Sequence, residues 1–148
     1  MKKQIAVVAA LLTAFTFTAF AQRHRIPTRA ESSFYRLFPN ATDASFKIVE
    51  EETVVAFVYN GKHSLIVYQN DGSVVGQGSY LDVNAIPTRL NGNLQRRFRK
   101  FDVLLLLQFS PANEETYYYV SLLTDKSQVI AKVYNNGYVE VCKREDRF

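Results

Sequence analysis

The stretch TVVAFVYNGKHSLIVYQNDG, residues 53–72, decides the fold class of this chain. Residues 53–59 and 63–68 are rich in β-branched and aromatic side chains, which favour strands. Asn60-Gly61 lies between them, and both residues tolerate the positive φ angles of a two-residue hairpin turn. Asn70-Asp71-Gly72 then forms a second tight turn. We therefore predict an antiparallel sheet built from hairpins.

Further strands are expected on both sides of this hairpin, in two sets of four. The first set comprises residues 45–49, 53–59, 63–68 and 73–79, and the second comprises residues 103–109, 116–123, 128–134 and 138–143. A short helix over residues 31–38 is expected before the first set, because Phe34, Leu37 and Phe38 share one helical face. A charged tail over residues 144–148 follows the second set.

A second helix, before the second set of strands, has the clearest pattern in the chain. Its apolar residues recur at spacings of three and four, at Ile86, Leu90, Leu94, Phe98 and Phe101. Pro87 suits a first helical turn, where its missing N–H has no partner to lose. Gly92 should weaken this helix by about 1 kcal/mol relative to alanine. We therefore expect the helix to be packed on a sheet.

The two halves of the chain resemble each other. Three pairs of positions keep their order at offsets of 63 to 65 residues: Phe34 with Phe98, Glu51-Glu52-Thr53 with Glu114-Glu115-Thr116, and Asn70-Asp71-Gly72 with Asn135-Asn136-Gly137. Turns of this composition are common, so chance competes with duplication. We expect an α+β fold of two repeats, residues 29–81 and 86–143, each a helix followed by four antiparallel strands.

An antiparallel sheet of this kind needs one face covered. The two repeats could join their sheets, or they could stack their helices against one long sheet. Either arrangement leaves the opposite sheet face open to water or to a partner.

The N-terminal residues have the features of a secretory signal peptide. Lys2 and Lys3 precede an apolar run over residues 5–20, and Ala19-Phe20-Ala21 supplies a small-x-small cleavage pattern. The run is short for a membrane span, although an uncleaved anchor is the alternative. We expect cleavage after Ala21, an extended lead-in over residues 22–28 and a domain over residues 29–148. The mature protein would be periplasmic or secreted, with no stable membrane insertion.

Composition narrows the classes of function. The 148 residues include 18 Lys or Arg and 14 Asp or Glu, and removal of the first 21 residues leaves 127 with a net charge of +2. This balance is not the footprint of a nucleic-acid-binding protein, so we expect no nucleic-acid partner. The single cysteine excludes an intramolecular disulfide and a cysteine-based zinc cluster. Eleven Phe and nine Tyr can supply the core instead.

The chain resembles the PepSY-like domains of exported bacterial proteins, a family described as similar to the β-lactamase inhibitory protein (BLIP) fold. The resemblance spans residues 33–143 and rests on turns and core aromatics: residues 34–37, Phe38-Pro39-Asn40-Ala41, Phe46, the acidic tip, Ala56-Phe57, Tyr68, Asn70-Asp71-Gly72, Ile86-Pro87 and Leu90. The family tends to carry a tryptophan in its first strand, where this chain has Phe46. The resemblance implies a BLIP-like fold and no catalytic residues, and β-lactamase inhibition does not follow from it.

The sequence gives little indication of a catalytic or metal-binding site. The only histidines are His24 and His63, too few for a metal site. Cys142 is expected as a buried or edge thiol of the last strand, and only His63 could serve it as a base. The carboxylates at 50–52 and at 114–115 are expected at solvated hairpin tips. We expect no catalytic residue, no metal and no cofactor.

Tyrosines are the most suggestive group of side chains. Tyr117, Tyr118 and Tyr119 are expected in one strand, so both of its faces carry a ring. On a sheet with one open face, at least one ring should be exposed, and tyrosine is favoured at protein contacts. The candidate binding residues are Tyr117, Tyr119, Tyr59, Tyr68, Tyr138, Arg96 and Arg97. The alternative is that the rings fill both layers of the core and that the arginines form a solvated helix face.

Three functions remain open at this point. The first is an exported, non-catalytic module that binds a protein or peptide, an inhibitor among the options, through an aromatic sheet face. The second is a small-ligand carrier or enzyme with a pocket between helix and curved sheet, for which residues 104–107 could form a lining. The third is a structural protein of the cell envelope. A deep pocket holding Glu or His would support the second function, whereas a filled core would reject it.

Overall fold

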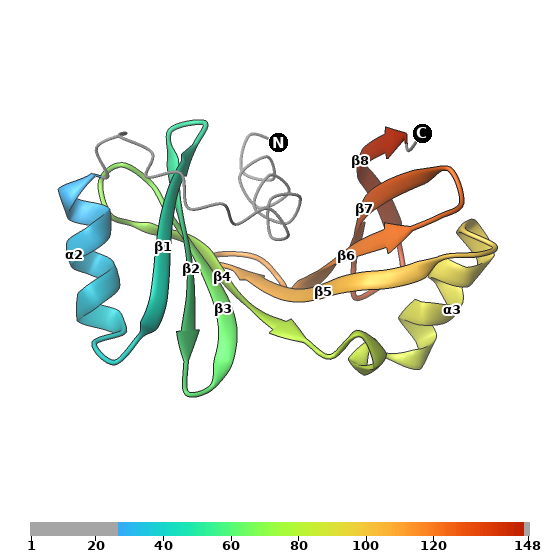
Figure 1. The fold of residues 1–148 in the computed structure, drawn as a ribbon, viewed down its shortest axis with the longest axis horizontal. Helices are drawn as coiled ribbons and strands as arrows, with labels where there is room; N and C mark the ends of the chain where they lie inside the picture. The colour runs from blue at the N-terminus through green and yellow to red at the C-terminus, as the bar shows by residue number, and fades with distance from the viewer. Residues whose placement is uncertain (1–26, 147–148) are drawn as a thin grey trace. The chain divides into compact units, whose positions relative to one another are not determined.

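Two helices and eight strands follow one another between residues 27 and 146, the part of the chain that the computed structural model describes (Figure 1). The chain separates into two units, the first ending at Ser79 and the second beginning at Tyr80. Each unit has one helix followed by antiparallel strands, so the fold is α+β, as predicted. The predicted signal peptide and residues 22–26 of the predicted lead-in lie outside the described residues.

The helix of the first unit begins earlier than predicted. The elements are α2 (Thr28–Leu37), β1 (Thr42–Val49), β2 (Glu52–Tyr59), β3 (Lys62–Tyr68) and β4 (Val74–Leu81). Pro27 precedes α2 with φ −56°, and its carbonyl accepts a hydrogen bond from the Glu31 N–H at 3.1 Å. The prediction that Thr28 belongs to an extended lead-in is therefore wrong, because Pro27 is already set for a first helical turn.

The two-residue turns of the first unit lie where the sequence predicts them. Tyr59 pairs with Lys62 across the β2–β3 turn, and the two residues between them, Asn60 and Gly61, have φ angles of 51° and 75°. Val49 likewise pairs with Glu52, so Glu50 and Glu51 form the β1–β2 tip with φ angles of 52° and 73°. Both turns have the positive φ angles that match the twist of the flanking strands.

The core of the first unit lies between α2 and one face of its strands (Figure 1). Its fully buried members are Ala30, Phe34, Val55, Phe57, Ile66 and Tyr68. The Phe34 ring lies at its centre, 4.9 Å from the Phe57 ring and 5.4 Å from the Phe46 ring. Phe46 thus contributes to the core at the position where the PepSY-like family tends to have tryptophan.

The second unit repeats this order of elements. After η1 (Val83–Ala85) come α3 (Thr88–Arg97), β5 (Asp102–Pro111), β6 (Tyr117–Leu123), β7 (Ser127–Val133) and β8 (Val139–Asp146). Two sequence predictions are wrong here. The helix does not reach Phe101, because Phe98 already has extended angles (φ −120°, ψ 107°). The last strand continues to Asp146 through residues predicted as a charged tail. It does so because β7 pairs with it as far as Ser127, whose partner is Asp146.

Apolar side chains fill the space between α3 and its strands. Leu90, Leu94 and Phe98 pack against Leu106, Val120, Leu122, Val129, Ala131, Val133 and Val139, and all ten are buried. Phe98 and Phe101 both belong to this packing, with ring centroids 6.4 Å apart. The predicted apolar stripe is therefore a packing surface, although its last two residues reach the core from extended backbone.

Three polar side chains hold α3 to the β7–β8 hairpin. Arg89, Asn93 and Arg97, spaced by four, donate hydrogen bonds to the carbonyls of residues 135, 137 and 139, spaced by two. Residues 135 and 137 belong to the β7–β8 turn, and Val139 begins β8. One face of α3 therefore binds three carbonyls along the turn and the start of β8.

The turns before β4 and β8 have the same hydrogen bonds in both units. The glycine N–H donates to a carbonyl three residues back, Gly72 to Gln69 and Gly137 to Tyr134, each at 2.9 Å. The next N–H donates to a side-chain oxygen two residues back, Ser73 to Asp71 and Tyr138 to Asn136, also at 2.9 Å. These turns keep the predicted offset of 65 residues.

The helices have a different offset from the predicted one. Phe38 and Phe98 are the equivalent residues, since each caps its helix by donating to the carbonyl four residues back, at 2.9 and 2.8 Å. The predicted pairing of Phe34 with Phe98 is therefore wrong. The signal for the true offset of 60 is the tetrapeptide Ile-Pro-Thr-Arg, which occurs at residues 26–29 and again at 86–89.

Candidate functional site

The face of strands β5–β8 that points away from α3 carries a connected group of aromatic rings. On β6, Val120 and Leu122 pack toward α3, so Tyr117 and Tyr119 point to the opposite face. Phe109 on β5 pairs with Tyr117 in register. We define the aromatic face by Phe109, Tyr117, Tyr119, Lys132, Tyr134 and Tyr138.

Each ring of the aromatic face contacts the next. The Tyr117 centroid lies 5.7 Å from that of Phe109, 5.4 Å from Tyr119 and 5.9 Å from Tyr134. Tyr134 in turn lies 5.8 Å from Tyr138. Such separations are those of favourable aromatic pairs. The rings thus form a chain that runs from β5 to the β7–β8 turn.

The predicted residues Tyr117, Tyr119 and Tyr138 come together here, but their exposure differs from the prediction. Tyr117 and Tyr119 are only 7% and 0% exposed, whereas Tyr138 is 61% exposed. The expectation that Tyr117 or Tyr119 would be an open contact residue is wrong, because neighbouring rings and Lys132 pack around them. Tyr138 is exposed because it lies in the turn.

Lys132 lies among these rings and was not singled out by sequence reasoning. It is only 4% exposed, and its Nζ lies 3.9 Å from the Tyr117 centroid and 4.7 Å from the Tyr134 centroid. Both distances are those of cation–π contacts. In register, Lys132 stands between Tyr119 on β6 and Glu140 on β8. A lysine within the otherwise apolar residues 129–133 was the signal that could have identified it.

The hydroxyl groups of Tyr117, Tyr119 and Tyr134 stay protonated at neutral pH. Burial raises the pKa of Tyr117, Tyr119 and Tyr134, and for Tyr134 the nearby Glu140 carboxylate adds to this effect. The Tyr134 hydroxyl donates to Glu140 Oε2 at 2.7 Å. Desolvation disfavours the charged phenolate. These tyrosines therefore act as hydrogen-bond donors and not as bases.

Cys142 lies beside the aromatic face on β8, partly buried and free of any disulfide. Its thiol pKa is raised to about 11, chiefly by burial and also by Glu140, while Lys132 opposes the rise. Very little thiolate exists at neutral pH under these conditions. The environment is the opposite of one that activates a cysteine nucleophile.

Four predicted binding residues lie elsewhere. Tyr59 and Tyr68 face α2 in the first unit, where Tyr68 is fully buried and the Tyr59 ring lies 5.1 Å from Phe38. Their grouping with Tyr117 is therefore wrong, since strand alternation places them on a helix-covered face. Arg96 and Arg97 are exposed on α3, and Arg97 Nη1 donates to the Val139 carbonyl at 2.8 Å. Arg97 thus has a structural partner.

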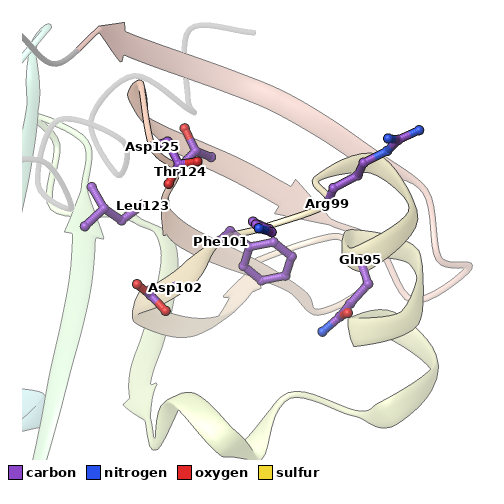
Figure 2. A pocket seen from close by; sticks show the side chains of 8 residues that line it. Gln95, Arg99, Phe101, Asp102, Leu123, Thr124 and Asp125 are labelled. Atoms are coloured by element: carbon purple, nitrogen blue, oxygen red, sulfur yellow. The ribbon is translucent and has the colours of Figure 1, made fainter.

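A hollow of about 510 Å³ lies at the end of α3 (Figure 2). It is lined by Gln95, Arg99, Lys100, Phe101, Asp102, Leu123, Thr124 and Asp125. Its lining includes neither Glu nor His, the residues that the carrier or enzyme hypothesis called for. The space between α3 and the strands, where that hypothesis placed its pocket, is filled by core side chains, among them Leu106.

No cluster of three or more His, Cys, Asp or Glu side chains within residues 27–146 could hold a metal ion. Within the same range, no helix is both long enough and apolar enough to cross a membrane.

Similarity to known proteins is found at the level of structure. No protein-family model and no curated protein matches the chain. A protein of Bacteroides eggerthii, provisionally described as periplasmic, is similar with a TM-score of 0.69 and 12% identity, over 83% of this chain and 90% of its own. A DUF2874 family protein of Bacteroides uniformis gives 0.68 and 12%, over 82% and 90%.

A BLIP-like protein of Bacteroides fragilis is similar with a TM-score of 0.63 and 15% identity, over 85% of this chain and 90% of its own. At such identities the likeness concerns the fold alone. The chain therefore has a BLIP-like α+β fold, and its resemblance to the PepSY-like family stays a prediction.

Proposed function

We propose that this protein is an exported, non-catalytic module that binds a protein or peptide of the cell envelope through the aromatic face. The observation that carries the proposal is the chain of rings from buried Phe109 to Tyr138, which is 61% exposed. Tyrosine supplies a large contact area with few rotatable bonds. Buried rings beneath an exposed one give that contact a rigid base.

A binding role is favoured over catalysis by the chemistry of the same face. The raised pKa values of Cys142, Tyr117, Tyr119 and Tyr134 disfavour the ionised forms in which these groups would act as nucleophile or base at neutral pH. The filled interior between α3 and its strands favours a surface contact over a carrier pocket.

Export is supported by the signal-peptide pattern of residues 1–21. The description of the Bacteroides eggerthii protein as periplasmic agrees with this placement. We place the mature protein in the periplasm or outside the cell, with no nucleic-acid partner. Inhibition of a β-lactamase is not part of the proposal, because a shared fold does not carry a function.

The test is the substitution Tyr138→Ala, which removes the exposed ring and keeps the backbone hydrogen bond to Asn136. Tagged protein is used to capture partners from an extract of its own cell envelope, and the bound proteins are quantified by mass spectrometry. We expect capture of a specific partner to fall at least about tenfold, as for a contact hot spot.

Tyr35→Ala is the matched control, because Tyr35 is also well exposed, at 48%, but lies on α2. It should capture as well as the unmodified protein. Equal capture by the folded Tyr138→Ala protein would contradict the proposal.

A further inference from the structure

The buried ammonium of Lys132 is contacted by no anion from residues 27–146. Among residues 27–146 its ammonium makes no ion pair and no hydrogen bond, and its neighbours are the faces of the Tyr117 and Tyr134 rings. Aromatic faces attract a cation but do not replace the hydrogen bonds that an ammonium makes in water. The Lys132 ammonium therefore has N–H groups that could donate hydrogen bonds to a ligand.

The acidic residue beside Lys132 is already engaged. Glu140 is its register partner on β8, but Glu140 Oε2 accepts the Tyr134 hydroxyl at 2.7 Å. Within the described residues, the carboxylate does not approach the ammonium closely enough for an ion pair. The charge of Lys132 is thus left for another anion.

A second unpaired donor lies on the other side of Lys132. Tyr119 is its register partner on β6, and the Tyr119 hydroxyl is fully buried without a hydrogen-bond partner in the described part of the chain. The neighbouring phenol is that of Tyr117, whose ring centroid lies 5.4 Å from that of Tyr119. Buried hydroxyl groups are nearly always paired in native proteins, so an unpaired one calls for an explanation.

We infer that Lys132 and Tyr119 form a carboxylate-binding site within the aromatic face, which receives an acidic side chain or a chain terminus of the partner. Lys132 and Tyr119 are paired residues of adjacent strands, and their ammonium and phenol are both hydrogen-bond donors of the kind that a carboxylate accepts from. A single negative charge matches the single ammonium, whereas a doubly charged phosphate would add a second negative charge beside the strand that carries Glu140. This inference rests on the proposed function and names the chemistry of its partner.

The first experiment uses small carboxylates as probes. The protein is labelled with ¹³C at lysine, and the Lys132 Cε signal is followed during titration with N-acetylglycylglycine, which presents a terminal carboxylate, and with N-acetylglutamate α-amide, which presents a side-chain carboxylate. N-acetylglutamine amide is the neutral control. We expect a saturable shift of the Lys132 signal with at least one carboxylate and none with the neutral probe. The carboxylate probe that binds more tightly shows whether the partner contributes a chain terminus or an acidic side chain.

Substitutions make this test specific. In the Lys132→Met protein binding is followed through the signals of the probe, because the Lys132 signal is lost, and this substitution should abolish the saturable change. Lys143→Met should not, because Lys143 is an exposed lysine that already pairs with Glu145 at 3.0 Å. Tyr119→Phe keeps the ring and loses one charge-assisted hydrogen bond, so we expect about tenfold weaker binding. It also serves as the informative variant if Lys132→Met does not fold.

Two results would overturn the inference: no saturable shift of the Lys132 signal, or unchanged probe affinity in the Tyr119→Phe protein. Partner capture separates this failure from failure of the proposed function. If Lys132→Met keeps the envelope partner while Tyr138→Ala loses it, the carboxylate site is wrong and the binding face stands. If Tyr138→Ala keeps the partner, the proposed function itself fails.

Discussion

The hydroxyl groups of Tyr68 and Tyr119 are buried and have no hydrogen-bond partner among the residues that the structure describes. Burial raises the pKa of Tyr68 to about 12, with Arg36 opposing the rise, and raises the pKa of Tyr119 even more. Each group loses its hydration on folding and gains no replacement. In the first unit this is a defect of packing, whereas in the second it coincides with the unpaired donor groups of Lys132.

Removal of either hydroxyl should stabilise the protein. We expect Tyr68→Phe and Tyr119→Phe each to raise the free energy of unfolding by about 1–2 kcal/mol, because a buried unpaired polar group is removed. Urea denaturation followed by circular dichroism measures this. Tyr134→Phe is the contrasting variant: it loses the bond to Glu140 and should destabilise by about 1–3 kcal/mol. A loss of stability in Tyr119→Phe would show that its hydroxyl is paired after all.

At the scale of elements, the effect of a glycine depends on the atoms that surround it. Gly92 lies within α3 with open space around its Cα, whereas Gly137 has φ +92° and closely faces the Asn93 side chain amide. That amide donates to the Gly137 carbonyl at 2.9 Å, one of the three bonds that hold α3 to the hairpin. The same residue type is therefore dispensable in one element and required in the next.

Alanine at these glycines should change stability in opposite directions. Gly92→Ala should stabilise by about 1 kcal/mol through helix propensity alone. Gly137→Ala should destabilise by about 1–3 kcal/mol, because its backbone is strained for alanine and Asn93 must move. Gly61→Ala, with φ +75° and open space, isolates the backbone strain. Urea unfolding of the three variants checks the order, and equal stability of the Gly61 and Gly137 variants would argue against the role of Asn93.

At the scale of the whole molecule, each unit builds one core under one helix, and further buried side chains lie on the strand faces away from the helices. Tyr68 and Tyr119 show the consequence, since the first lies in a helix-covered core and the second on the opposite face of its strands. Function at the aromatic face also depends on delivery of the protein to the envelope.

Export predicts a defined N-terminus. We expect protein released from the periplasm by osmotic shock, or recovered from the medium, to begin at Gln22, as measured by intact mass and N-terminal sequencing. Ala21→Arg should block cleavage, because the residue before the cut must be small. A native protein that begins at Met1 and stays with the membrane fraction would contradict this prediction.

Local rules predicted most of the fold. Strand order, the Asn60-Gly61 turn and the apolar positions of α3 follow from residue alternation, positive φ and helical spacing, which act over a few neighbouring residues. The offset of the helices was also present in the sequence, in the repeated Ile-Pro-Thr-Arg, but the spacing of Phe34 and Phe98 suggested another value.

The sequence by itself determined the α+β class, the positions of the hairpins and the alternation that brings Tyr117 and Tyr119 to one strand face. Only the tertiary structure decided that these rings are buried, that Tyr138 is the exposed one and that Lys132 lies among them. Exposure and pairing depend on side chains from strands that are distant along the chain. Strand alternation predicts the face of the sheet to which a side chain points, whereas the neighbouring strands determine which side chains it contacts there.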